Sequence, residues 1–311
     1  MLKSNKFIRW LVAIWFMALI MNPYQTSAAT TSQPGLFLQQ AFNDGTLNNQ
    51  SLVILDLDDT TITTPEGQWL GRSEMFYYLV DQEMQRNPGR TRQSIVDEID
   101  PLLTLVYGKV PVQLTDETLP DTINQLISKG VTVIGMTARG LPVADATRWQ
   151  LKEVGITFSD TGAERFIALP GDRQFVVEHG VVLAGQGNRK GEVLIALIEN
   201  KLLPKPERVM LVDDHDRHLD SVQQAVMSFD SDITYVPVLC TYLEGKKRFD
   251  SVESEQQLLD FLYQWRNDRT VSNFVDQDAY SQGFIARCKA IPAREKYCDA
   301  LLQHYGILPD S

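Results

Sequence analysis

Short apolar runs alternate with amphipathic stretches from Ser51 to Trp265, and this alternation predicts repeated strand and helix units. The runs are continuously apolar, which is typical of strands buried on both faces of a parallel sheet. They are Leu52–Leu55, Val131–Gly135, Arg208–Val212 and Ile233–Leu239. Helical patterns occupy Thr115–Lys129, Pro142–Val154, Glu192–Leu203 and Glu253–Trp265. The pattern therefore predicts an α/β fold, a Rossmann-like parallel sheet with flanking helices.

Two segments depart from this alternation. The first and second strands are separated by about 70 residues, where a loop and one helix need far fewer. The excess, about residues 66–112, contains two helix-like segments, Ser73–Gln85 and Thr91–Val106, and we expect a small helical cap inserted after the first strand. The other segment, Phe158–Gly187, has short apolar pieces separated by glycines, which predicts short strands or a hairpin at the sheet edge.

The N-terminus has the pattern of a secretory signal peptide. Lys3, Lys6 and Arg9 precede the uncharged apolar run Trp10–Met21, and small residues follow it. This run is shorter than the roughly 20 residues that a membrane span needs, so an uncleaved anchor is the weaker alternative. We therefore expect residues 1–29 to be removed, leaving an exported protein, periplasmic or secreted, with no stable membrane insertion.

The rest of the chain divides into three predicted parts. Residues 30–50 are polar with one amphipathic patch and are treated as an N-terminal extension, residues 51–269 form the core with its cap, and residues 270–311 form a helical C-terminal extension. A proline in the last part separates Cys288 from Cys298, so two short helices can fold back on each other. Export then favours a Cys288–Cys298 disulfide, with two reduced cysteines as the alternative.

Composition excludes several classes of function. The 311 residues include 29 Lys and Arg against 40 Asp and Glu, a formal net charge of −11, so no long-range field attracts nucleic acid, and none is expected as a partner. The 3 cysteines are too few for a disulfide-scaffolded miniprotein or a multi-site zinc protein. Cys240, within an apolar strand, is expected to be a buried thiol.

The candidate chemistry lies at the carboxyl ends of the predicted strands, where open α/β sheets bind ligands. The first strand runs directly into Asp56 and Asp58, which project together from an extended turn. A pair of carboxylates this close can divide the work of nucleophile or metal ligand and general acid. The alternative is an acidic loop whose aspartates cap the next turn.

Three further elements follow in order along the chain. Thr137 offers a hydroxyl beside a helix N-terminus, where a phosphate group is favoured. Lys190 opens a helix, an unfavourable place for a cation that suggests carboxylate partners, with Arg189 as the competing candidate. The last motif, with Asp213 and Asp214, is rich in oxygen and free of cysteine, and suits Mg²⁺ better than zinc.

Together these motifs resemble those of the haloacid dehalogenase superfamily, of its phosphatase kind. They are DLDDTT at 56–61, GMTARG at 135–140, GNRKGE at 187–192 and DDHDRHLD at 213–220, and they match in residue type, order and position after strands. The segment around Trp69, the last motif and the signal peptide further resemble an exported bacterial branch of that superfamily. This narrower resemblance supplies no substrate.

The resemblance implies a role for each motif residue. Asp56 would attack phosphorus and become an aspartyl-phosphate, and Asp58 would protonate the leaving oxygen and later deprotonate water. Thr137 would hydrogen-bond the phosphoryl group, and Lys190 would hold the nucleophile and phosphate together. The metal ligands that the resemblance implies for Mg²⁺ are Asp56, Asp58, Asp214 and, as neighbour or alternative, Asp213.

One motif position departs from the superfamily pattern. Members often carry Asp or Asn four residues beyond the metal-binding Asp, and His218 stands there instead. Arg139 and His215 adjoin motif residues and are expected either to touch substrate or to lie on the surface. Four aromatic residues of the cap, Trp69, Phe76, Tyr77 and Tyr78, form either a wall over the site or, as the favoured alternative, the cap's own core.

The sequence thus predicts a Mg²⁺-dependent phosphohydrolase that cleaves small phosphate monoesters through an aspartyl-phosphate on Asp56. A phosphotransferase with the same intermediate is one alternative, because it differs only in the acceptor. An exported binding protein that retains the fold without catalysis is the other.

Overall fold

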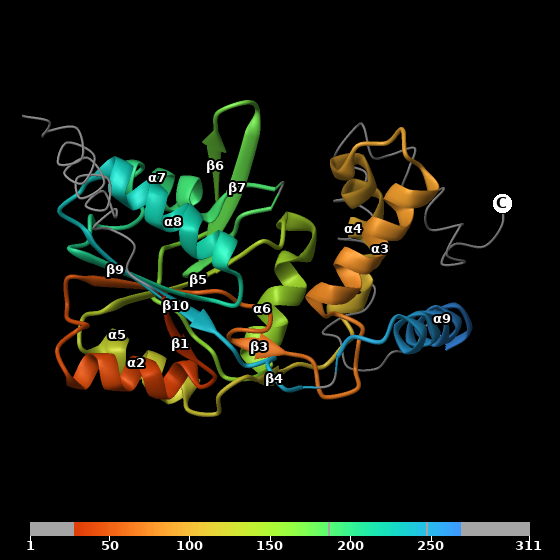
Figure 1. Cartoon of the computed structure of the whole chain (residues 1–311), viewed down its shortest axis with the longest axis horizontal. Coiled ribbons are helices and arrows are strands. Elements are labelled where there is room, and N and C mark those ends of the chain that lie inside the picture. The colour runs from red at the N-terminus through yellow and green to blue at the C-terminus, as the bar shows by residue number, and fades with distance from the viewer. Residues whose placement is uncertain (1–27, 186, 247, 269–311) are drawn as a thin grey trace, which may run out of the picture.

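The computed structural model describes residues 28–268 with the exception of residues 186 and 247, and it centres on an eight-stranded sheet (Figure 1). The strand order is β1-β10-β9-β2-β5-β8-β7-β6, with parallel pairing from β1 to β8 and antiparallel pairing at the β8-β7-β6 edge. The strands are β1 Ala29–Thr31, β2 Ser51–Leu55, β5 Thr132–Thr137, β6 Arg165–Leu169, β7 Arg173–Glu178, β8 Val181–Leu183, β9 Arg208–Asp213 and β10 Thr234–Cys240. The predicted α/β fold and the edge hairpin are confirmed.

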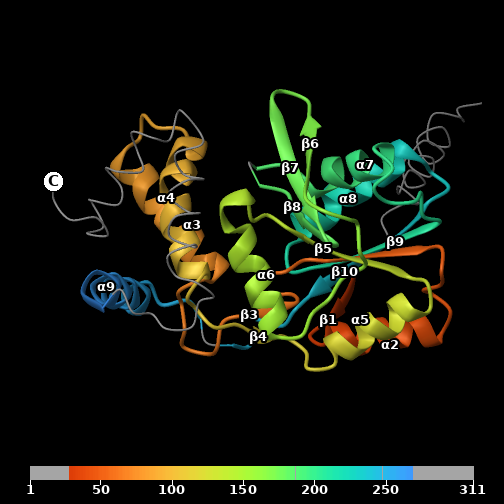
Figure 2. The same cartoon turned by 180° about the vertical axis from the view of Figure 1, so that it is seen from behind.

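Helices cover both faces of the sheet. On one face lie α2 Pro34–Asn43, α5 Leu119–Ser128 and α6 Ala144–Glu153, the last preceded by the 3₁₀ turn η1 Leu141–Val143, and on the other face lie α7 Lys190–Glu199 and α8 Asp216–Phe229 (Figures 1 and 2). The positions of β2 side chains explain why four successive residues, Leu52 to Leu55, are all apolar. Val53 and Leu55 pack toward α2 and α5, whereas Leu52 and Ile54 pack toward α7 and α8.

The cap leaves the core after β2 and returns before α5. Its base is a two-stranded antiparallel pair, β3 Ile62–Thr63 and β4 Gln113–Leu114, and its body is α3 Ser73–Arg86 and α4 Arg92–Tyr107. Helix α9 Ser251–Asp268 lies beside α3 in both views (Figures 1 and 2). The predicted helical cap after the first strand is therefore present, and the end of the core chain packs against it.

The segment expected to be an N-terminal extension instead belongs to the core. Strand β1 adds to the sheet beside β10, and Leu38 of α2 is buried against the sheet. The side chain of Asp116 fixes the start of α2 by accepting hydrogen bonds from the backbone of Gly35 at 2.8 Å and Leu36 at 3.1 Å. The sequence pattern missed this because a three-residue strand carries almost no periodicity.

The remaining terminal predictions fall mostly outside the described residues. These are the signal peptide up to residue 27, the C-terminal extension from residue 270, and the Cys288–Cys298 disulfide. Within the part of the chain that the structure describes, no helix has both the length and the apolar character needed to cross a bilayer. Cys240 is a buried free thiol, as expected.

Candidate active site

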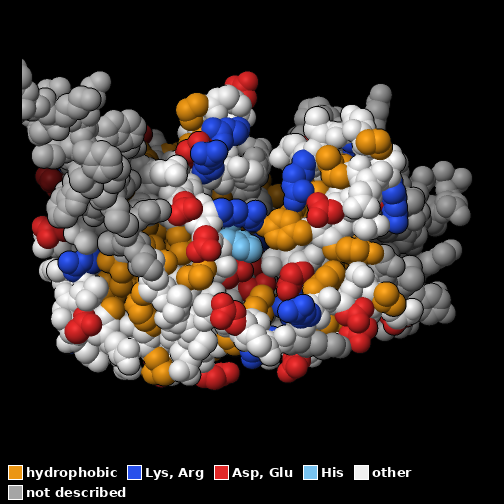
Figure 3. Space-filling model, in the orientation of Figure 1, with side chains coloured by type: hydrophobic (Ala, Val, Ile, Leu, Met, Phe, Trp, Pro, Cys, Tyr) orange, Lys and Arg blue, Asp and Glu red, His pale blue; other side chains and the backbone are white. Residues whose placement is uncertain are grey.

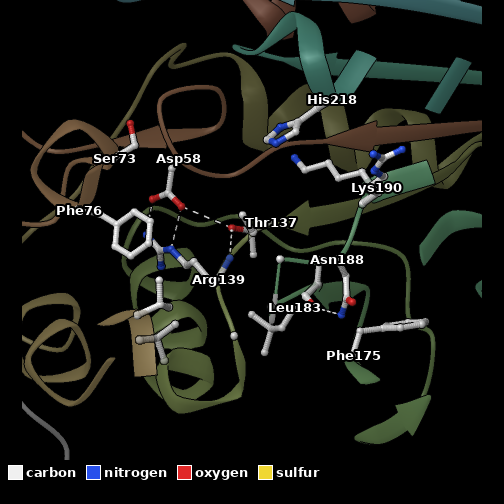
Figure 4. A pocket seen from close by; sticks show the side chains of 18 of the residues that line it. Asp58, Ser73, Phe76, Thr137, Arg139, Phe175, Leu183, Asn188, Lys190 and His218 are labelled. Atoms are coloured by element: carbon white, nitrogen blue, oxygen red, sulfur yellow. Dashed lines mark hydrogen bonds and ion pairs between the residues drawn. The ribbon is translucent and has the colours of Figure 1, made fainter. Parts of the chain in front are cut away.

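The predicted site residues meet at the carboxyl ends of the central strands. Asp56 follows β2, Thr137 ends β5, Asp213 ends β9, and Lys190 is the first residue of α7. Asp56, Thr137 and Lys190 border a cavity of about 1320 Å³ between the core and the cap, and Figure 4 shows part of it. Asp213 is fully buried beside Lys190. On the face of the molecule drawn in Figure 3, basic, acidic and His side chains gather at the centre, between the core and the cap.

A tight turn after β2 presents the first two aspartates. The Asp56 backbone amide continues the pairing with β9 by donating to the Val212 carbonyl, and the Thr61 hydroxyl donates to the Asp56 carbonyl at 2.5 Å. Asp59 takes a left-handed backbone conformation with φ 58°, which Asp tolerates better than most residues. Its buried carboxylate accepts hydrogen bonds from Thr63 at 2.7 Å and from Ser73 of α3 at 3.0 Å, so the same turn holds the start of the cap helix.

Lys190 joins two carboxylates from neighbouring strands. Its Nζ donates to Asp56 Oδ1 at 2.5 Å and to Asp213 Oδ2 at 2.6 Å, and the side chain is 2% exposed. A buried ammonium is costly unless it is paired. Although burial opposes its charge, Asp213 and Asp56 outweigh that effect and raise the Lys190 pKa above its usual range. The structure thus brings together the partners that the sequence suggested for Lys190, while the rival Arg189 is exposed.

The acidic side chains around Lys190 form a compact group. One oxygen from each of Asp56, Asp213 and Asp214 lies within 4.8 Å of the others. Burial, reinforced by the charge of Asp56, raises the Asp214 pKa to about 9. Three carboxylates facing one ammonium leave this pocket short of positive charge, and the donors are all oxygen. Both properties suit Mg²⁺. The carboxylate of Asp58 lies outside this group.

His218 also contacts this acidic group. Its Nδ1 lies 2.9 Å and 3.1 Å from the two carboxylate oxygens of Asp213, and the backbone amide of His215 donates to Asp213 Oδ1 at 2.9 Å. Although burial disfavours the charge of Asp213, which is 0% exposed, Lys190 and His218 lower its pKa to about 2. His218, the residue that departs from the superfamily pattern, therefore contributes its side chain to the site.

Asp58 faces the other side of the cavity and is held by Arg139. The guanidinium donates from Nη2 to Oδ1 at 2.6 Å and from Nε to Oδ2 at 2.9 Å, and Thr137 Oγ1 lies 3.4 Å from Oδ2 (Figure 4). Arg139 also donates to Gln150 at 2.7 Å and stacks 4.2 Å from the Tyr107 ring of α4. It is buried, so the expectation of a surface side chain is wrong for this residue.

The four cap aromatics divide into two pairs. Trp69 and Tyr78 pack against Phe249, and Trp69 also donates to Glu253 of α9, so both lie where the cap meets the α9 segment and not in the cavity wall. Phe76 and Tyr77 instead line the cavity. His215, the other residue expected to touch substrate, lines the cavity too and lies edge-on to Tyr77 with ring centroids 6.4 Å apart.

A family model described as "Protein of unknown function (DUF2608)" matches residues 37–274. The chain belongs to this family. No curated protein matches the chain.

Among solved structures, the DUF2608 chain is similar to a class C acid phosphatase from Bacillus anthracis with tungstate bound, at 15% identity and TM-score 0.35, over 81% of this chain and 86% of the other. Another structure of the class C acid phosphatase from this organism gives 15% identity, TM-score 0.32, and coverages of 80% and 85%. A phosphoserine phosphatase, described as a phospho-aspartyl intermediate analogue, gives 14% identity and TM-score 0.27 over 55% of this chain and 83% of that one.

In this DUF2608 protein the site combines two differently charged halves. One half holds Asp56 beside an ammonium and two further carboxylates, an arrangement suited to a nucleophile and a divalent cation. The other half holds Asp58 in a bidentate pair that fixes both of its oxygens. Thr137 lies between Asp58 and Lys190 in Figure 4, and all three line the same cavity.

Proposed function

We propose that the protein is a Mg²⁺-dependent phosphomonoester hydrolase of the haloacid dehalogenase superfamily, with Asp56 as nucleophile. The observation that carries this proposal is the Lys190 bridge, because it fixes a buried aspartate at the end of β2 beside a second acidic strand end. Asp58, separated from Asp56 by one residue, supplies the second carboxylate that the reaction needs as an acid. The cavity of about 1320 Å³ has room for a small phosphorylated molecule.

In the first half of the reaction, a carboxylate oxygen of Asp56 attacks phosphorus and the bond between phosphorus and the ester oxygen breaks. Asp58 gives a proton to the departing oxygen, so the alcohol leaves neutral. In the second half, Asp58 takes a proton from water, whose oxygen displaces Asp56 from phosphorus and releases inorganic phosphate. Asp56 and Asp58 then return to their starting protonation states.

The surrounding residues supply positioning and charge. Lys190 limits the motion of Asp56 and offsets the charge of the arriving phosphate, which is the main demand of phosphoryl transfer. Thr137 Oγ1 accepts a hydrogen bond from the Arg139 backbone amide at 3.1 Å, and as a donor it makes a long contact of 3.4 Å to Asp58, so its proton is able to turn to a phosphoryl oxygen. Mg²⁺, held by Asp56, Asp213 and Asp214, would supply further neutralisation of the phosphoryl oxygens.

We further propose that the enzyme acts outside the cytoplasm. The support is the basic start and apolar run before residue 22 in the sequence. Expression of the full chain followed by N-terminal sequencing of the mature protein tests this, since an intact N-terminus on the mature protein would contradict export with cleavage.

The central experiment compares Asp56→Asn and Asp58→Asn on two substrates, 4-nitrophenyl phosphate and an alkyl phosphate. We expect Asp56→Asn to abolish turnover of both, because an amide lacks the charge needed for attack. We expect Asp58→Asn to slow the alkyl phosphate far more than the nitrophenyl ester, whose leaving group needs little protonation. Near wild-type activity of Asp56→Asn would contradict the nucleophile assignment.

The metal is tested separately on the wild-type protein. EDTA is expected to inactivate the enzyme and added Mg²⁺ to restore it, and Mg²⁺ is expected to raise the melting temperature by binding the folded state. Full activity of the metal-free protein would contradict the metal site. A screen of phosphomonoesters with and without Mg²⁺ then addresses the substrate.

A further inference from the structure

A continuous series of hydrogen bonds runs from the cap to Asp56 through His218. Arg217, at the start of α8, donates from Nη2 to the Tyr77 hydroxyl of α3. The same guanidinium donates from Nε to His218 Nε2 at 3.3 Å. His218 in turn contacts Asp213, and Asp213 shares Lys190 with Asp56.

The two contacts of the His218 ring fix its tautomer. An arginine Nε–H donates and never accepts, so His218 Nε2 has to be the acceptor nitrogen. The ring proton then lies on Nδ1, which faces both oxygens of Asp213. A neutral imidazole therefore satisfies both partners at once, with donor and acceptor in the required places.

Because Asp213 is buried, its carboxylate depends on the hydrogen bond from His218. Asp213 is 0% exposed, so its carboxylate depends on protein donors, and the described ones are Lys190, His218 and the His215 backbone amide. Lys190 has to stay between Asp213 and Asp56 to hold the nucleophile. An acidic residue at position 218 would add a fourth carboxylate to this group, whereas His218 provides a donor without adding negative charge.

We propose that His218 is a positioning residue that fixes Asp213, and through it Lys190, against Asp56, and that Tyr77 of the cap supports the required tautomer through Arg217. This inference rests on the proposed phosphatase function for its kinetic consequences. The tautomer of His218 follows from its hydrogen bonds and does not depend on that function. The cap thus contacts the surroundings of Asp56 through side chains that also line the cavity, namely Tyr77, Arg217 and His218.

The kinetic experiment compares three substitutions at this position with 4-nitrophenyl phosphate as substrate. We expect His218→Ala to lower kcat about 10–100-fold with KM changed less than about threefold, as is typical when a side chain that orients a site residue is lost. His218→Asn places an amide donor near the Nδ1 position and should recover most of this loss. His218→Asp should be at least as impaired as His218→Ala. His179→Asn, at an exposed turn outside the cavity, is the matched control with unchanged kcat.

Equal kcat values for His218→Asn and His218→Ala would overturn the positioning role, as would a wild-type kcat for His218→Ala. A double-mutant cycle tests the link to the cap. Arg217→Ala should lower kcat in the wild-type background and have no further effect in the His218→Ala background. Additive losses would show that Arg217 acts independently of His218, and would refute the link.

A spectroscopic experiment determines the tautomer of His218 without measuring phosphatase activity. The chain has 4 histidines, so ¹⁵N-labelled histidine gives few signals, and the His218→Asn variant identifies the one from His218. At pH 8 we expect a protonated Nδ1 and an unprotonated Nε2. Protonation of Nε2, alone or together with Nδ1, would overturn the proposed arrangement. If the wild-type protein had no phosphatase activity, the proposed function would fail while this measurement still decided the His218 contact.

Discussion

Replacing Gly191 by alanine tests whether the close approach of α7 and α8 places Lys190. Gly191 follows Lys190 and packs against α8, and its backbone amide donates to Ser221 Oγ at 3.2 Å. A methyl group at this position would lie 2.2 Å from the Ser221 carbonyl oxygen and 2.7 Å from Ala225 Cβ. Normal contacts need about 3.5 Å, so the helices would have to separate by about 1 Å.

The energetic effects of this substitution oppose each other. Alanine is favoured over glycine in a helix by about 1 kcal/mol, whereas overpacking a well-filled interior costs about 1–3 kcal/mol. Because the obstructing atom belongs to the backbone of α8 rather than to a flexible side chain, we expect a net loss of about 1–2 kcal/mol. For a protein of this size, that lowers the melting temperature by roughly 2–8 °C.

Expressed as free energy, the loss of turnover should exceed the loss of unfolding free energy. A displacement of about 1 Å at a catalytic group can lower the rate by about 100-fold, and Lys190 is adjacent to the altered residue. Thermal unfolding followed by circular dichroism and steady-state kinetics on 4-nitrophenyl phosphate measure the two effects. Gly89→Ala is the matched control, because no atom lies within 4 Å of its added Cβ. A Gly191→Ala protein as stable and as active as wild type would refute the reasoning.

Three further predictions concern single side chains. Burial raises the pKa of Asp59 from 3.8 to about 6, so the folded state retains a proton that the unfolded chain loses between these values. The free energy of unfolding of the protein should therefore fall by up to about 3 kcal/mol as the pH rises through this window. Urea titrations in EDTA should show that Asp59→Asn removes this pH dependence. Burial raises the pKa of Cys240 to about 12, so in a variant with the other two cysteines changed to serine, the thiol reagent DTNB should react only after denaturation. Arg139→Lys loses the fork that holds Asp58 and should slow an alkyl phosphate more than 4-nitrophenyl phosphate, whereas equal losses would separate Arg139 from the leaving-group step.

Local sequence patterns were sufficient for strands β2, β5, β9 and β10 and for the residues at the strand ends. Strand β2 is apolar from Leu52 to Leu55 and is followed directly by Asp56, so both its burial and its chemistry are visible in a few residues. Lys190 was also predictable, because a cation at the start of a helix indicates a nearby negative partner. The spacing of the cap helices was sufficient to place the insertion.

What the sequence could not show depends on distant residues. Arg139 and Asp58 are separated by 81 positions, and nothing near Arg139 distinguishes a buried ion pair from a surface cation. Strand β1 pairs with β10 across more than half the chain, and no local signal encodes that pairing. Helix α8 was not predicted although Leu219, Val222 and Val226 have helical spacing, because the helix begins inside the acidic motif, where charged residues interrupt the apolar pattern.

Two carboxylates near the proposed nucleophile, Asp58 and Asp213, are each connected to the cap through an arginine and an aromatic ring. Asp58 is held by Arg139, which stacks on Tyr107 of α4, and Asp213 is reached from Tyr77 of α3 through Arg217 and His218. Because the two connections begin on different cap helices and end at different carboxylates, a rigid shift of the cap would disturb both at once. The cap therefore contributes to the geometry of Asp58 and Asp213 as well as to the cavity wall. Removing it should lower turnover even of substrates too small to touch it.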